Sequence, residues 1–114
     1  MKLKEIVAAA GLTVRAAPQG LGAEVTGGYA SDLLSCVMAK AQEGNLWVTL
    51  QAHPNIVAVA SLHDLAGIVI TEGQEPNPQT VEKANEHGVC IMTTEHATFT
   101  IVAKLAELGV RGVD

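Results

Sequence analysis

Short runs of apolar residues alternate along this chain with segments in which apolar residues recur at every third or fourth position. The second pattern is typical of amphipathic helices, and most of these segments end at a glycine, which readily adopts the left-handed conformation found just beyond a helix. In the first segment, Leu3, Ile6, Val7 and Ala10 share one face and precede Gly11. The predicted helices cover residues 2–10, 33–42, 55–65, 80–87 and 97–108.

The short apolar runs predict strands at residues 12–16, 46–50, 68–70 and 89–92, together with a β-prone segment over 21–30. Because the runs are apolar throughout, the sheet should be buried on both faces, and helical connections between strands indicate parallel pairing. We therefore predict an α/β fold, a three-layer α/β/α sandwich with a mainly parallel central sheet. The less regular first half leaves room for one antiparallel or edge strand, and its Gly27-Gly28 pair predicts a bulge or a close backbone approach.

Length and composition indicate one small globular domain spanning residues 1–114, with 48% hydrophobic and 17% charged residues. No apolar run reaches the length of a membrane span, and the first residues lack the pattern of a secretory signal. Cys36 and Cys90 each lie in an apolar run without a CxxC motif, so we expect buried free thiols and a cytoplasmic location.

The charge balance argues against nucleic-acid polymers as partners. The formal net charge is -5, the few basic residues are scattered, and aromatic residues make up only 3% of the chain. A phosphate-binding surface needs clustered lysine and arginine, and single-stranded nucleic acids need aromatic side chains on which bases stack.

The sequence lacks the motifs of the common phosphate and acyl-transfer enzymes. There is no Gly-Lys pair, and therefore no P-loop, which argues against a kinase. The nucleophile motif GxSxG and the HExxH zinc motif are absent too, so we predict no metal and no cofactor. Ser31 and Asp32 precede the helix 33–42, where one of them is expected to cap its first turn, and Thr94 or Glu95 could likewise cap the last helix.

Polar residues follow several predicted strands, where ligands bind in open parallel sheets. Gln51, His53 and Asn55 follow the strand 46–50, and Thr93 and Thr94 follow the strand 89–92. Two interpretations stay open for them: they bind a ligand, or they satisfy backbone groups of the turns in which they lie. A small enzyme is a minor alternative, and its best residues would be His53, Glu72, Glu95 and His96 if folding brings them together.

Three stretches carry a resemblance to a known family: GGYASDLLS at residues 27–35, LWVTLQ at 46–51 and HPNIVAVA at 53–60. On these the chain resembles the DRTGG-domain family over nearly its whole length, as a short member similar to the N-terminal, non-catalytic domain of the HPr serine kinase. The family's name motif appears only as its Thr-Gly-Gly part, at Thr26, Gly27 and Gly28, and the Asp-Arg pair is missing.

The resemblance implies a fold like that HPr kinase domain, a tendency to form homodimers, and a non-catalytic regulatory or ligand-sensing role. The ligand expected is a small anionic metabolite or nucleotide. The alternative is a purely structural protein–protein interaction module that uses the nearly all-apolar helix 55–65 or the exposed face of another helix. The candidate ligand-binding residues are Thr26, Gly27, Gly28, Ser31, Asp32, Gln51, His53, Asn55, Thr93 and Thr94.

Overall fold

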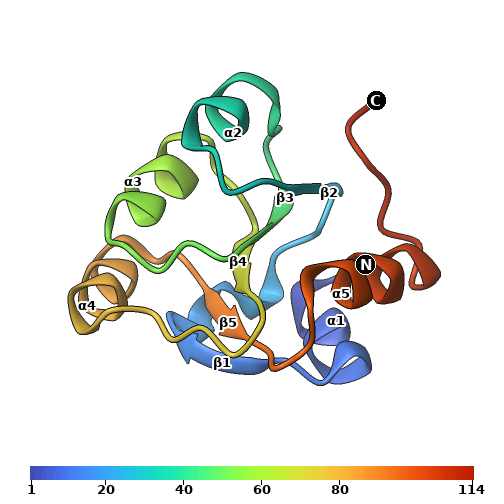
Figure 1. Cartoon of the computed structure of the whole chain (residues 1–114), viewed down its shortest axis with the longest axis horizontal. Helices are drawn as coiled ribbons and strands as arrows, with labels where there is room; N and C mark the ends of the chain where they lie inside the picture. Colours follow the sequence, from blue (N-terminus) through green and yellow to red (C-terminus); the bar gives the residue numbers. More distant parts are fainter.

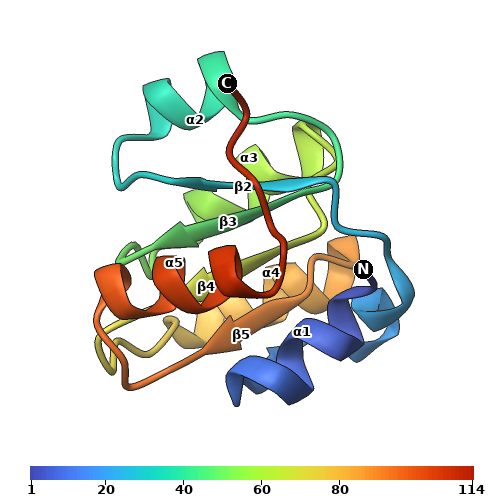
Figure 2. The same cartoon turned by 90° about the vertical axis from the view of Figure 1, so that its right-hand side faces the viewer.

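The computed structural model describes all residues of the chain, 1–114, as a five-stranded sheet with helices on both faces. Figures 1 and 2 show this arrangement from two directions. The strands are β1 (Thr13–Ala16), β2 (Gly27–Ala30), β3 (Asn45–Thr49), β4 (Gly67–Ile70) and β5 (Ile91–Thr93). The helices are α1 (Leu3–Ala10), α2 (Leu34–Lys40), α3 (Asn55–Leu62), α4 (Pro78–His87) and α5 (Thr98–Glu107), with a short 3-10 helix, η1 (Pro18–Gly22).

The strand order in the sheet is β1-β5-β4-β3-β2. β2, β3, β4 and β5 run parallel, and β1 pairs antiparallel with β5 at one edge. The expected mainly parallel sandwich is therefore confirmed, and β1 is an antiparallel edge strand in the first half of the chain, where the sequence left room for one. The four parallel strands end at one edge of the sheet, which we call the carboxyl edge, and begin at the opposite, amino edge.

Two apolar cores lie on the two faces of the sheet. α2, α3 and α4 cover one face, as Figure 1 shows, and the core between them includes Trp47, Ile68 and Ile70. α1 and α5 cover the other face, over a core that includes Leu46 and Met92. Every residue of β3 and β4 is buried, because each strand sends alternate side chains into the two cores.

The glycine pair in β2 marks a close backbone approach and not a bulge. The segment after α5 (the C-terminal tail, residues 110–114) crosses the free edge of β2, and the N–H of Gly28 donates a hydrogen bond to the carbonyl of Arg111 at 2.8 Å. Figure 2 shows the tail rising from α5 past β2. A Cβ atom on Gly27 would lie 2.8 Å from that carbonyl oxygen, so only glycine fits here. The irregularity in the sheet lies instead in β1, between Val14 and Ala16.

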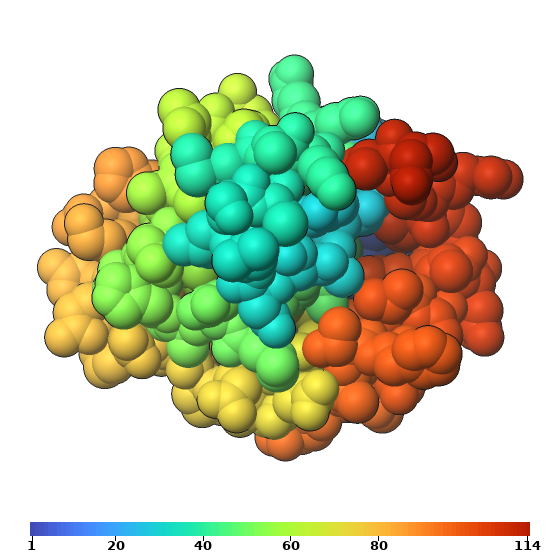
Figure 3. Space-filling model, turned by 45° about the horizontal axis from the view of Figure 1, so that its top comes forward, coloured from blue at the N-terminus to red at the C-terminus, as the bar shows by residue number.

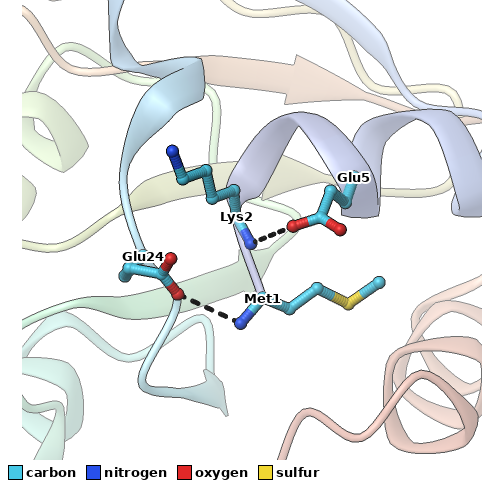
Figure 4. A network of polar contacts seen from close by, with 4 residues as sticks. All are labelled: Met1, Lys2, Glu5 and Glu24. Atoms are coloured by element: carbon cyan, nitrogen blue, oxygen red, sulfur yellow. Dashed lines mark hydrogen bonds and ion pairs between the residues drawn. The ribbon is translucent and has the colours of Figure 1, made fainter.

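The start of the chain is fixed by polar contacts that Figure 4 shows at close range. The amino group of Met1 forms an ion pair with Glu24 at 3.1 Å, and the N–H of Lys2 donates a hydrogen bond to the Glu5 carboxylate at 2.8 Å. Lys2 also forms an isolated antiparallel bridge with Glu24. These contacts hold the entry of α1 against the segment that leads into β2.

Two predicted helix caps are wrong. The residue at the N-terminal cap of α2 is Leu33, and that of α5 is Ala97; neither helix has a side-chain cap. Ser31 accepts a hydrogen bond from the N–H of Leu33 at 3.1 Å, which closes a turn before the helix and does not cap the first helical turn. Thr94 does the same for the N–H of His96 at 3.2 Å.

Most other predicted boundaries agree with the structure to within a few residues, and α3 ends at Leu62, three residues before the predicted end. None of the helices combines the length and the apolar character needed to cross a membrane.

Candidate functional site

Asp32 organises the carboxyl edge where β2 and β3 end. Its carboxylate accepts a hydrogen bond from the hydroxyl of Thr49 at 2.8 Å and one from the N–H of Leu50 at 2.7 Å. The side-chain amide of Gln51 donates to the carbonyl of Asp32 at 3.0 Å, and the indole of Trp47 donates to the carbonyl of Ser31 at 2.9 Å. The structure therefore brings Ser31, Asp32 and Gln51 together, and their polar atoms mainly hold the two loops to each other.

A tight turn closes the carboxyl end of β4. The N–H of Gln74 donates to the carbonyl of Thr71 at 3.2 Å, and the two residues between them have positive φ, 59° at Glu72 and 72° at Gly73. These values are typical of a type I′ turn, in which a glutamate at the first central position is unusual and strained. The N–H groups of Glu72 and Gly73 donate to the carbonyls of His96 and Thr94, so the turn is tied to the end of β5.

Thr93 and Thr94 are buried at the end of β5. The hydroxyl of Thr93 lies 3.5 Å from the Arg15 guanidinium, which forms an ion pair with Glu75. Thr93 and Thr94 border a small polar hollow of about 120 Å³. Because Arg15 already has an acidic partner, this hollow offers little free positive charge to an anion.

The three motif residues shared with the family lie at the amino edge, away from Asp32 and Gln51. Thr26 donates from its hydroxyl to the carbonyl of Glu43 at 2.7 Å and accepts from the side-chain amide of Asn45 at 3.2 Å. Asn45 is 2% exposed and also accepts from the N–H of Gln42. Thr26, Gly27 and Gly28 therefore fasten β2 to the turn before β3 and receive the C-terminal tail. The ten candidate residues do not form one site.

His53 and Asn55 lie in a third place, at the mouth of a groove between α3 and α4. The open space in this groove is about 500 Å³, within the range of small-molecule sites. Its lining residues are His53, Pro54, Asn55, Val57, Ala58, Ser61, Leu62, Lys83 and His87. We call this the α3–α4 groove.

A hydrogen bond within the turn determines which ring nitrogen of His53 is free to contact a ligand. Its Nδ1 accepts a hydrogen bond from the N–H of Asn55 at 3.1 Å, the turn-closing role expected as one of two interpretations. In the neutral ring the proton is then on Nε2, which is left as a donor. His53 is exposed, so this donor is accessible to a ligand.

The remaining polar groups of the groove come from α4. Lys83 and His87 are four residues apart and therefore lie on the same side of the helix. None of the nine lining residues is acidic, although Asp and Glu number 12 in the chain. Neither Lys83 nor His87 is among the residues predicted from the sequence, because their relation to His53 depends on the packing of α4 against α3. The i, i+4 spacing was the one signal available.

The four residues of the enzyme alternative do not form one hydrogen-bonded group, although Glu72 and His96 are joined through their backbones. Glu72, Glu95 and His96 lie in the loops after β4 and β5, whereas His53 lies at the start of α3. No side-chain hydrogen bond joins any two of the four, and no cluster of three or more His, Cys, Asp or Glu side chains is placed to hold a metal ion.

Comparison with solved structures supports the fold. The CBS and DRTGG domains of the regulatory region of a Clostridium perfringens pyrophosphatase, complexed with the activator diadenosine tetraphosphate, match with a TM-score of 0.71 and 16% identity. The match covers 91% of this chain and 45% of that one, so this chain is similar to less than half of that regulatory region. No curated protein matches the sequence.

A family model confirms the resemblance seen in the sequence. The model of the DRTGG domain matches residues 21–108, which includes β2 to β5, α2 to α5 and the Thr-Gly-Gly part of the name motif. The match ends before the C-terminal tail that contacts Gly28. The chain is a member of the DRTGG domain family.

Proposed function

We propose that this domain is a non-catalytic regulatory module that senses a small anionic metabolite, of the nucleotide type, by binding it in the α3–α4 groove. The observation that carries the proposal is the composition of the groove: His53, Lys83 and His87 supply nitrogen donors, and no lining residue is acidic. In a chain with a net charge of -5, such a surface is a local exception that favours an anion.

The shape of the groove favours a ligand with an apolar part as well as a charged one. Val57 and Ala58 line it, and Leu62 is 71% exposed beside them. An aromatic base can cover this apolar surface while a phosphate group meets Lys83, a residue type that binds phosphates as a point charge. The regulatory region of the similar pyrophosphatase was solved with diadenosine tetraphosphate, which makes nucleotides the first ligands to try.

Isothermal titration of the whole chain with diadenosine tetraphosphate, ATP, AMP and inorganic phosphate tests the proposal. We expect one of the nucleotides to bind more tightly than phosphate, with an affinity that falls as salt is raised. Lys83→Ala should weaken that binding at least tenfold. Lys4→Ala is the matched control, because Lys4 is an exposed lysine on α1, which covers the opposite face of the sheet. If no nucleotide binds at millimolar concentration, the ligand proposal is wrong.

Another outcome would contradict the proposed location of the site but not the proposed ligand-binding function. If a nucleotide binds but Lys83→Ala and His87→Ala leave its affinity unchanged, the α3–α4 groove is not the site. The cluster around Asp32, Gln51 and Ser31 at the carboxyl edge is then the next candidate to test, with Gln51→Ala.

We also propose that the domain works as a homodimer in the cytoplasm. Both cysteines are free thiols, which fits a reducing compartment. Several large apolar side chains are exposed, among them Phe99 at 86%, and contact with a second copy would remove such side chains from water. Sedimentation velocity between 5 and 200 µM, the range in which roughly micromolar dimers populate, should show a species of twice the chain mass. A monomer throughout would contradict the dimer and favour a different protein as the partner.

A further inference from the structure

We propose that a second copy of this chain docks on the face of α5 that borders β2, with Phe99 of each copy inserted into a hollow of the other. The inference rests on the proposed homodimer and assigns its surface. It starts from the uneven covering of the sheet, since α1 and α5 enclose the core beneath them while β2, at the edge of the sheet, stays partly uncovered.

The uncovered part forms an apolar hollow of about 170 Å³. Its floor is β2 and Val48 of β3, one wall is α5, with Val102, Leu105 and Ala106, and the other wall is the C-terminal tail. In Figure 3 this region is the depression between the cyan surface of β2 and the orange and red surface of α5 and the tail. β2 contributes Gly28, Tyr29 and Ala30 here, and Gly28 and Ala30 carry little or no side chain to fill the space.

A matching projection stands on the same helix. Phe99, the only phenylalanine of the chain, is 86% exposed in the first turn of α5, and Val102 is 41% exposed one turn later. The spacing i, i+3, i+4, i+7 of one helix face is followed by four exposed residues, Phe99, Val102, Ala103 and Ala106. An apolar cavity of about 150 Å³ holds a benzene ring, so a hollow of this size has room for one aromatic side chain.

A projection and a hollow on one face of the same chain are what a two-fold contact requires. In a two-fold dimer the same patch occurs on both sides, so Phe99 of each copy can fill the hollow of its partner. If the two α5 helices cross antiparallel, the N-terminal end of each faces the C-terminal end of the other, which is the favourable order of helix dipoles.

Charge also favours this face for two identical acidic chains. Two copies with a net charge of -5 repel each other over most of their surfaces. The apolar stripe of α5 has no charged residue, and the one charged residue that lines the hollow is Arg111. Arg111 follows the end of α5 and the exposed Glu95 precedes its start, so an antiparallel contact brings opposite charges to each end.

Sedimentation velocity of three variants tests this surface. Phe99→Asp and Ala106→Glu place a carboxylate on the projection and on the wall of the hollow, and each should weaken the dimer at least tenfold. Met38→Asp is the matched control, because Met38 is a 48% exposed apolar residue on α2, which covers the opposite face of the sheet. It should leave the dimer unchanged. Because Phe99 is so exposed, Phe99→Asp should retain the wild-type circular dichroism spectrum.

The outcomes separate the surface from the dimer itself. If the wild-type chain is a monomer at every concentration, the proposed homodimer fails and the assignment of its surface fails with it. If the wild-type chain is a dimer and Phe99→Asp and Ala106→Glu dimerise equally well, the dimer stands and this surface is wrong. Equal weakening by Met38→Asp would also overturn the assignment, since a general effect of added negative charge would then explain the loss.

Discussion

The side chain of Asp32 reaches from the end of β2 to the end of β3, where its carboxylate accepts a hydrogen bond from the hydroxyl of Thr49 at 2.8 Å. The same oxygen accepts the N–H of Leu50 at 2.7 Å. Asp32→Ala leaves both donors without this partner, so we expect the free energy of unfolding to fall by about 1–2 kcal/mol. Asp32→Asn keeps an acceptor oxygen and should lose less. Urea denaturation measures both, and an unchanged midpoint in Asp32→Ala would show that the contact contributes nothing.

The same contact explains why the cap of α2 could not be predicted from the sequence. Ser31 and Asp32 stand just before a helical segment, which is the usual signature of an N-terminal cap. The local sequence pattern cannot predict that Asp32 bonds to the end of β3, because the two lie side by side only after the sheet has formed. The strands, in contrast, were predictable because their apolar character depends on burial on both faces and is visible in the sequence itself.

The close approach of the C-terminal tail requires glycine at position 27, so replacing Gly27 should lower the free energy of unfolding. A Cβ atom at position 27 would lie 2.8 Å from the carbonyl oxygen of Arg111, which is backbone and cannot yield without moving the tail. We expect Gly27→Ala to lower the free energy of unfolding by about 1–3 kcal/mol.

The control for Gly27→Ala is Gly22→Ala. A Cβ atom on Gly22 would meet nothing within 4 Å, so this change should be neutral or slightly stabilising, by up to about 1 kcal/mol, through the unfolded state. Both are compared by urea denaturation at one temperature. Equal stabilities for the two variants would mean that the tail moves aside at no cost.

Thr26 gives a second test of the structural role of the shared motif. Thr26→Val keeps the shape of the side chain but removes the hydroxyl that donates to Glu43 and accepts from Asn45. Because Asn45 is buried, its amide loses a partner, and we expect a loss of about 1 kcal/mol. Thr100→Val, at an exposed position of α5, is the control and should stay within about 0.5 kcal/mol of the wild type. A similar thermal midpoint for both variants would contradict the role of Thr26.

The sequence located parts of the candidate site but could not assemble them. His53 and Asn55 were identified from their place after a strand, and the structure puts them at the mouth of the α3–α4 groove. Lys83 lies in the same groove but is more than twenty residues away in the sequence. Its place beside His53 results from the packing of α4 against α3, which a local sequence pattern cannot predict. The motif residues Thr26 and Gly28 were grouped with them, but they lie at the opposite, amino edge of the sheet. They stand at the start of β2, which pairs in parallel with the start of β3, whereas His53 and Asn55 follow the end of β3.

The buried thiol of Cys90 predicts how stability changes with pH. Burial disfavours the thiolate and raises the pKa of Cys90 from 9.0 to about 11. Between these values the unfolded chain loses this proton while the folded chain keeps it, so the free energy of unfolding should fall as pH rises from about 9 to 11. Below pH 9 this group adds no slope. Lysine and tyrosine also titrate in this range, so the measurement is the difference in urea midpoints between the wild type and Cys90→Ala at each pH. That difference should shrink as pH rises, because the variant lacks this one group; a constant difference would show that the thiol ionises as readily in the folded chain as in the unfolded one.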